Sequence, residues 1–129
     1  MDNKPLETQP IDLEKTKRAV VDAIEDIKGF DINVMDVRKL TSMASYMIIA
    51  SASSSRQSKA LAHNVSEKLK ALGVATQGIE GEREGEWVLL DLGEVIVHIM
   101  LPTARAYYNL EQLWGATQDS RQSAARATP

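Results

Sequence analysis

The side chains that could do chemistry are a serine-rich turn, a few carboxylates and two histidines. Residues 51–59, SASSSRQSK, follow an apolar run and precede a helical pattern. Backbone N–H groups at such a junction often bind phosphate. One hypothesis is therefore a phosphate- or nucleotide-binding enzyme that uses the Ser53–Lys59 turn together with Asp36. The turn contains no glycine and no GxxxxGK[ST] pattern, so the residues favour the alternative, an ordinary helix N-cap with solvated cations.

The carboxylates and histidines do not form a metal or catalytic pattern. Asp31 and Asp36 are an odd number of positions apart on a predicted strand, which places them on opposite faces. His63 and His98 are far apart in the sequence, and no HExxH-like spacing is present. We therefore expect no catalytic residue, no metal and no cofactor, and interpret the chain as a protein that is not an enzyme.

Length and composition limit the class of protein. The 129 residues suit one domain, and the absence of cysteine excludes disulfides and thiolate metal sites. No apolar run approaches the ~20 residues of a membrane span, and the first residues do not form a signal pattern. We expect a cytoplasmic location and no membrane contact. A net charge of −3 argues against a protein whose main task is to hold nucleic acid, and suits a basic protein partner.

The hydrophobic pattern predicts an α/β fold with a single mixed β-sheet of about five strands packed with three helices. Asp12 is the expected N-cap of the first helix, and Gly29 its left-handed C-cap. We expect a flexible N-terminal arm (1–12), one domain (13–115) and a disordered C-terminal tail (116–129). The predicted helices are 13–28, 56–72 (closed by Gly73) and 103–114, and the predicted strands are 31–37, 46–50, 74–77 and a hairpin over 87–101.

The hairpin turns at Leu92-Gly93, and its register decides which side chains share a face. A three-residue turn with Gly93 in the left-handed region avoids a positive φ at Leu92. This register would place Trp87, Leu89, Val95, Val97 and Ile99 on one face and Val88, Leu90, Ile96, His98 and Met100 on the other. Both faces are apolar, so part of the sheet could stay uncovered for a partner.

The last predicted helix divides its aromatic residues between core and surface. Tyr107, Leu110 and Trp114 repeat at helical spacing and are expected in the core, whereas Tyr108 and Arg105 form an exposed pair typical of interfaces. An acidic rim would surround the hairpin and favour a basic partner; its members are Glu80, Glu82, Glu84, Glu86, Asp91 and Glu94.

Several of these segments, read in order, resemble the ribosomal silencing factor family, also called Iojap-like. The resemblance covers about residues 13–115. It rests on DINVMDVRKL, YMIIAS, SSRQSKALAHNVSEKL, EGEREGEWVLLDLGEVIVHIM and the pattern P-x-x-R-x-Y-Y-x-L-E-x-L-W-G at Pro102–Gly115.

The resemblance implies a nucleotidyltransferase-like fold without catalytic equipment. It also implies binding to protein fourteen of the large ribosomal subunit, a basic protein at the subunit interface. Bound there, such a protein would block joining of the small subunit and lower translation under nutrient limitation; a role in large-subunit maturation is also implied.

From the residues we predict one partner-binding set on the hairpin and the last helix. We expect little or no direct RNA contact and no small-molecule substrate, and two copies could pair through the same hairpin when off the ribosome. The predicted set is Trp87, Leu90, Asp91, Glu94, His98, Met100, Arg105 and Tyr108.

Overall fold

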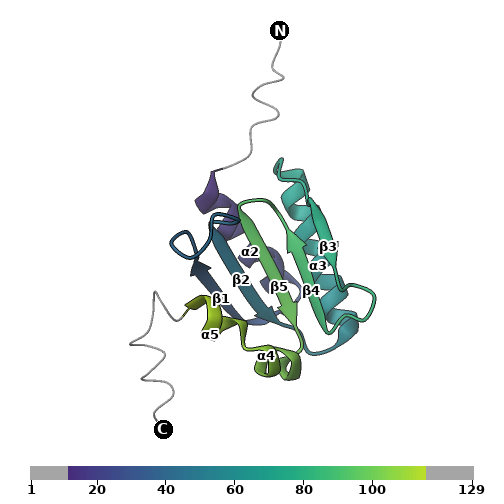
Figure 1. Cartoon of the computed structure of the whole chain (residues 1–129). Coiled ribbons are helices and arrows are strands. Elements are labelled where there is room, and N and C mark those ends of the chain that lie inside the picture. Colours follow the sequence, from purple (N-terminus) through teal and green to yellow (C-terminus); the bar gives the residue numbers. More distant parts are fainter. Residues whose placement is uncertain (1–11, 116–129) are drawn as a thin grey trace.

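The structure, a computed structural model, describes residues 12–115 (Figure 1). The predicted N-terminal arm, apart from Asp12, and the predicted C-terminal tail lie outside the described residues. The elements in chain order are α2 (Leu13–Asp26), β1 (Phe30–Asp36), β2 (Tyr46–Ser51), α3 (Ser55–Ala71), β3 (Gly78–Glu80), β4 (Trp87–Asp91), β5 (Val95–Met100), α4 (Pro102–Tyr108) and α5 (Leu110–Gly115).

The five strands form one mixed sheet in the order β1-β2-β5-β4-β3. Strands β2 and β5 run parallel, and the other neighbours pair antiparallel. The interior strand β2 is buried along its whole length, which explains why its sequence, YMIIAS, is almost continuously apolar. The predicted α/β fold with a single mixed sheet is confirmed.

The helices lie on both faces of this sheet (Figure 1). Helices α2 and α3 cover one face, where their apolar stripes pack against the strands in the larger core cluster. Helices α4 and α5 cover only part of the other face, where a smaller cluster contains Met35, Met47, Ile49 and Met100. Within residues 12–115, the second face is therefore covered over only part of its area.

Helix α2 begins at its predicted cap, Asp12, and helix α3 begins at Ser54, within the serine-rich turn that was expected to cap it. The backbone N–H of Lys15 donates to the side chain of Asp12 over 2.9 Å, and the N–H of Gln57 donates to Ser54 Oγ over 3.1 Å. The end of α2 differs from the prediction, because Lys28 and not Gly29 takes the left-handed conformation, with φ 67°. Gly29 is needed for space instead, since a Cβ there would overlap Cγ2 of Ile24.

The predicted last helix is broken at Asn109. This residue has φ 50° and its side chain bonds Gln112, so α4 ends there and α5 begins at Leu110. Asparagine tolerates the left-handed region without the signal that glycine or proline would give in a sequence. The described residues therefore hold four helices instead of three.

Two smaller predictions were also wrong. Residues 74–77 do not form a strand; the short edge strand β3 lies just after them and pairs with β4. Tyr107 is not in the core, because the break at Asn109 changes the helical phase and leaves its side chain 81% exposed.

Candidate functional site

The partly covered face of the β4–β5 hairpin is the candidate functional site. Because strand side chains alternate, those on the side away from α2 and α3 can be read from the pairing register. We call this set the open face; it consists of Trp87, Leu89, Asp91, Ile96, His98 and Met100. The alternate residues Val88, Leu90, Val95, Val97 and Ile99 lie in the core beneath α2 and α3.

This grouping corrects the predicted hairpin faces. The N–H of Leu92 donates to the carbonyl of Val95 over 2.9 Å, which leaves only Gly93 and Glu94 at the tip. Gly93 takes the positive φ, 91°, and Leu92 does not. The predicted turn included Leu92, and this error of one residue mixed side chains from the two real faces.

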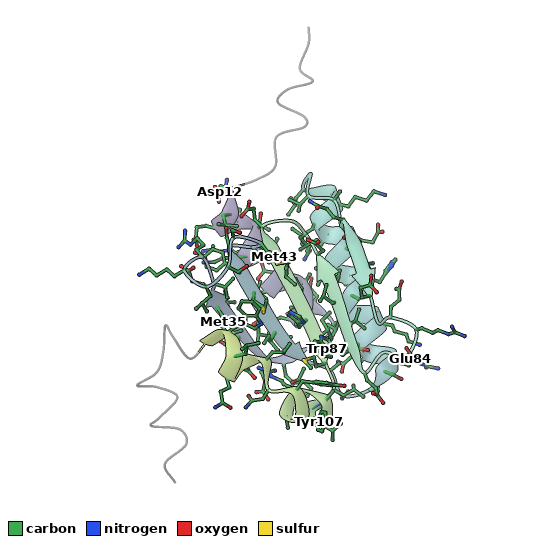
Figure 2. All side chains as sticks on the ribbon, in the orientation of Figure 1. Asp12, Met35, Met43, Glu84, Trp87 and Tyr107 are labelled. Atoms are coloured by element: carbon green, nitrogen blue, oxygen red, sulfur yellow. The ribbon has the colours of Figure 1, made fainter. Side chains whose placement is uncertain are left out.

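An aromatic cluster lies at one end of the open face. The indole Nε1–H of Trp87 donates to Nδ1 of His98 over 2.9 Å, and the ring of Trp87 lies 4.7 Å from that of Tyr108. The ring centroids of Tyr107 and Tyr108 lie 4.9 Å apart, with the two rings nearly perpendicular. Figure 2 shows Trp87 and Tyr107 at this lower end of the sheet, with Met43 in a loop toward the other end. The contacts from His98 to Trp87 and from Trp87 to Tyr108 thus run from the buried strand β5 to the exposed helix α4.

His98 is the buried member of this cluster. Its Nδ1 accepts from Trp87, so the neutral ring carries its proton on Nε2. This Nε2 is the one buried side-chain polar atom without a hydrogen-bond partner in the described part of the chain. Burial lowers the pKa of His98 to about 4, so the imidazole is neutral at physiological pH.

Arg105 holds α4 and α5 against the sheet. Its guanidinium donates to Ser51 Oγ at 2.8 Å and to both carboxylate oxygens of Glu111, at 2.9 and 3.0 Å. Glu111 also accepts from Asn33 Nδ2 at 2.8 Å. Charge-assisted bonds of this fork geometry fix an orientation, so Arg105 positions the helix that carries Tyr108.

The other end of the open face is acidic. Asp91 accepts from the N–H of Gly93 at 2.8 Å, and Glu94 accepts from the hydroxyl of Ser45. A third carboxylate, Glu80 on the edge strand β3, pairs in the register with Leu89 of β4. The loop before Ser45 also carries an apolar residue, Met43, which is 79% exposed. Asp91 and Glu94 thus lie at the end of the hairpin opposite the aromatic cluster.

The structure brings most of the predicted partner-binding residues to this surface, but in different roles. Tyr108 and Glu94 are exposed, and Trp87 and Asp91 are partly exposed. His98 and Met100 are buried beneath them, and Arg105 is mostly enclosed by its bonds. Leu90 was wrongly included, because it is fully buried on the opposite face.

Sequence reasoning missed Leu89, Ile96 and Met43, which are all at least partly exposed. Leu89 and Ile96 share the face of Trp87, and the alternation of β4 and β5 would have shown this if the turn had been placed correctly. Met43 lies in a loop without periodicity, so no signal in the sequence indicated it.

The alternative phosphate site is not assembled. Asp36 pairs with Tyr46 at the start of β2, whereas the Ser53–Lys59 turn follows the end of the same strand. The polar groups of the turn are also used internally. Gln57 accepts from Ser53, Ser54 caps α3, and Ser58 donates to the carbonyl of Gly85. The turn and Asp36 therefore cannot bind one small ligand together.

Within residues 12–115, no three His, Asp or Glu side chains come together in a way that could hold a metal ion. In the same part of the chain, no helix has the length and apolar character needed to cross a membrane.

Comparison with known families gives one consistent match. The model of the family described as "Ribosomal silencing factor during starvation" matches residues 10–128. The ribosomal silencing factor RsfS of Chromobacterium violaceum is 48% identical over 110 residues, which is 85% of this chain and 90% of that protein. The mouse protein named "Mitochondrial assembly of ribosomal large subunit protein 1" is 33% identical over 87 residues, 65% of this chain and 38% of that protein.

Solved structures agree with this match. A crystal structure of a protein from Chromobacterium violaceum superposes with a TM-score of 0.80 at 50% identity, covering 81% of this chain and 88% of the other. A crystal structure of a protein from Bacillus halodurans has a TM-score of 0.72 at 31% identity and covers 78% and 94% of the two chains.

Proposed function

The chain belongs to the ribosomal silencing factor family, and from this premise we propose that it docks on the large ribosomal subunit and sterically prevents the small subunit from joining. The proposed contact is protein fourteen of the large subunit, a basic protein at the subunit interface. Translation would fall when nutrients are limiting. The proposed place of action is the cytoplasm, and the protein acts without catalysis.

The open face is the observation that carries this proposal. It combines the partly exposed side chains of Trp87, Leu89 and Ile96 with the carboxylate of Asp91. The exposed Tyr108 lies against Trp87, and the exposed Glu94 lies at the hairpin tip. Interfaces are typically built from such an apolar centre and a polar rim, and aromatic residues dominate their energetics. The carboxylates suit lysine and arginine side chains on a basic protein, because complementary charge speeds and orients docking.

Blocking subunit joining requires only occupancy of the right surface. A contact of standard size, about 1,600 Å² in total, is enough for a stable complex. In this mechanism the partner buries the exposed surface of four side chains, those of Trp87, Leu89, Ile96 and Tyr108. His98, Met100 and Arg105 are largely buried, so their proposed role is to hold the contacting residues in place from beneath.

A contribution to large-subunit assembly is a second candidate, because the mouse relative is named for that process. Both activities would use the same docking surface. Accumulation of large-subunit precursors in cells that lack the protein would support assembly, whereas normal precursors with excess joined ribosomes in starvation would support silencing alone.

Sedimentation with purified large subunits, small subunits and joined ribosomes tests docking directly. We expect the protein to migrate with free large subunits only, and joined ribosomes to decrease as protein is added. Binding to neither subunit at near-physiological salt would refute the proposal.

Charge reversal tests the surface itself. The double substitution Asp91→Lys with Glu94→Lys should weaken binding to large subunits by about tenfold and reverse its salt dependence. The matched control is Glu25→Lys with Glu67→Lys, which makes the same charge change at exposed positions on α2 and α3, on the other side of the sheet. Equal effects of the two pairs would mean that net charge, and not the open face, controls docking.

Pairing of two copies through the open face is part of the proposal for the protein off the ribosome. An interface made from one patch on both copies is self-complementary, so docking and dimerisation would compete. Sedimentation velocity over a dilution series should show a dimer that Trp87→Ala dissociates; a dimer that resists this substitution would use another surface.

A further inference from the structure

A groove lies on the opposite side of the sheet from the open face, between the beginning of α2 and the edge strand β1. Its volume is about 560 Å³, within the range of about 300–1,000 Å³ that small-molecule sites occupy. Its walls come from three consecutive elements of the chain. The lining residues are Glu14, Lys17, Arg18 and Val21 of α2, Val34 and Asp36 of β1, and Tyr46 of β2.

Tyr46 is buried, and two cationic side chains lie over its ring. The ammonium group of Lys17 lies 4.0 Å from the ring centroid, and the guanidinium carbon of Arg38 lies 5.2 Å from it. Arg38 is committed to Asp36, to which it donates through Nε and Nη2. These bonds lower the pKa of Asp36 to about 2 and leave its charge balanced. Asp36 therefore opposes an incoming anion only weakly.

The two cations in the lining, Arg18 and Lys17, can both reach a ligand. Arg18 is exposed and has no ion pair or hydrogen bond from its side chain within residues 12–115. Lys17 pairs with Glu14, but the Glu14 side chain is 74% exposed. Exposed pairs of this kind contribute about 0–1 kcal/mol, so Lys17 can exchange Glu14 for a better acceptor at small cost.

The remaining wall is apolar. Val34 points into the groove from an edge strand and is 38% exposed, and Val21 faces it from α2. Apolar surface next to Arg18 and the exchangeable Lys17 suits a ligand with an anionic end and a weakly polar body.

We propose that this groove binds a phosphorylated small molecule of nucleotide size, with its phosphate on Arg18 and Lys17 and its body against Val21 and Val34. The guanidinium of Arg18 can donate two parallel bonds to phosphate oxygens, the geometry in which arginine recognises phosphate best. The inference does not depend on ribosome docking, because the groove and the open face lie on different sides of the sheet.

Amide NMR of the ¹⁵N-labelled full chain, titrated with adenosine monophosphate, tests the proposal. We expect saturable shifts at Lys17, Arg18, Val21 and Val34, about tenfold weaker binding of adenosine because it lacks the phosphate, and intermediate binding of ribose 5-phosphate. No saturable shift up to millimolar nucleotide would overturn the proposal. Saturable shifts elsewhere would also overturn it, as would a groove that binds only a short RNA oligonucleotide.

Substitution of Arg18 then separates the groove from general charge effects. Arg18→Ala should weaken nucleotide binding by about tenfold or more, whereas Lys59→Ala, an exposed cation on α3, should leave it unchanged. The amide spectrum of each variant shows directly whether it is folded. Equal affinity of Arg18→Ala and the wild-type chain would contradict the assigned site.

Discussion

The indole N–H of Trp87 donates to Nδ1 of His98 across the β4–β5 pair, at 2.9 Å. The two residues are diagonal neighbours on one face, since Trp87 pairs with Met100 and His98 with Leu89. The bond fixes the tautomer of His98 and the orientation of Trp87, whose other neighbour is Tyr108. A buried histidine therefore controls how the main aromatic residue of the open face is presented.

Replacement of His98 should reveal this control. His98→Leu removes the acceptor and leaves the indole N–H without a partner, which should lower the free energy of unfolding by about 1–3 kcal/mol. His98→Asn keeps an acceptor close to the position of Nδ1 and should recover part of the loss. Urea unfolding measures the stability. Trp87 fluorescence in a Trp114→Phe background measures the environment of the indole, and an emission maximum unchanged in His98→Leu would contradict the positioning role.

The lowered pKa of His98 predicts a specific dependence of stability on pH. The unfolded chain takes up a proton on this ring near pH 6.5, whereas the folded chain does so only near pH 4. The contribution of His98 to the free energy of unfolding is therefore complete above about pH 6.5. It decreases as the pH falls from about 6.5 to about 4 and levels off below that range. The difference in pKa corresponds to about 3 kcal/mol.

Urea unfolding between pH 4.5 and 7.5 checks this expectation. The free energy of unfolding should change less steeply with pH in His98→Asn than in the wild-type chain. His63→Asn serves as the control for loss of a histidine at an exposed position on α3. Asp36 does not disturb the comparison, because its pKa falls from 3.8 to about 2 and its contribution changes below this window. Parallel pH profiles for the wild-type chain and His98→Asn would mean that other groups cause the dependence.

Much of the fold could be predicted because local physics and the fold agree. Asp12 and Ser54 are strong N-caps, and YMIIAS can be so apolar only in a strand buried on both faces. The break at Asn109 could not be predicted, because the helical pattern continues through it and the left-handed conformation depends on packing of α5.

The candidate site was harder to predict because it depends on one turn residue. Gly93 is the first residue of the tip and not the second, and this difference exchanges the two faces of part of the hairpin. Leu90 was assigned to the wrong face for this reason. Both strands are apolar on both sides, so hydrophobic alternation could not correct the register.

Gly29 was singled out in the sequence, but the role predicted for it was wrong. It was expected as a left-handed cap, but its role is close packing beside Ile24 and Leu61. Gly29→Ala should lower the free energy of unfolding by about 1–3 kcal/mol, because the added methyl overpacks this contact. Gly78→Ala is the matched control, since nothing lies within 4 Å of a Cβ at that position. Thermal or urea unfolding decides, and a Gly29→Ala variant as stable as Gly78→Ala would contradict the packing explanation.

Leu89 and Leu90 are adjacent leucines on opposite faces of β4, and they provide the sharpest separation of stability from docking. Leu90 is fully buried beneath α2 and α3, so Leu90→Ala should lower the free energy of unfolding by about 2–5 kcal/mol. Leu89 is partly exposed on the open face, so Leu89→Ala should cost much less stability.

Binding to large subunits should show the reverse order. Leu89→Ala removes apolar surface that the partner would bury and should weaken docking by about fivefold to tenfold, whereas folded Leu90→Ala should bind normally. Sedimentation with large subunits at a temperature where both variants are folded measures this difference. If Leu90→Ala lost affinity and Leu89→Ala did not, the docking surface would have to lie on the helical side of the sheet, and the assignment of the open face would be wrong.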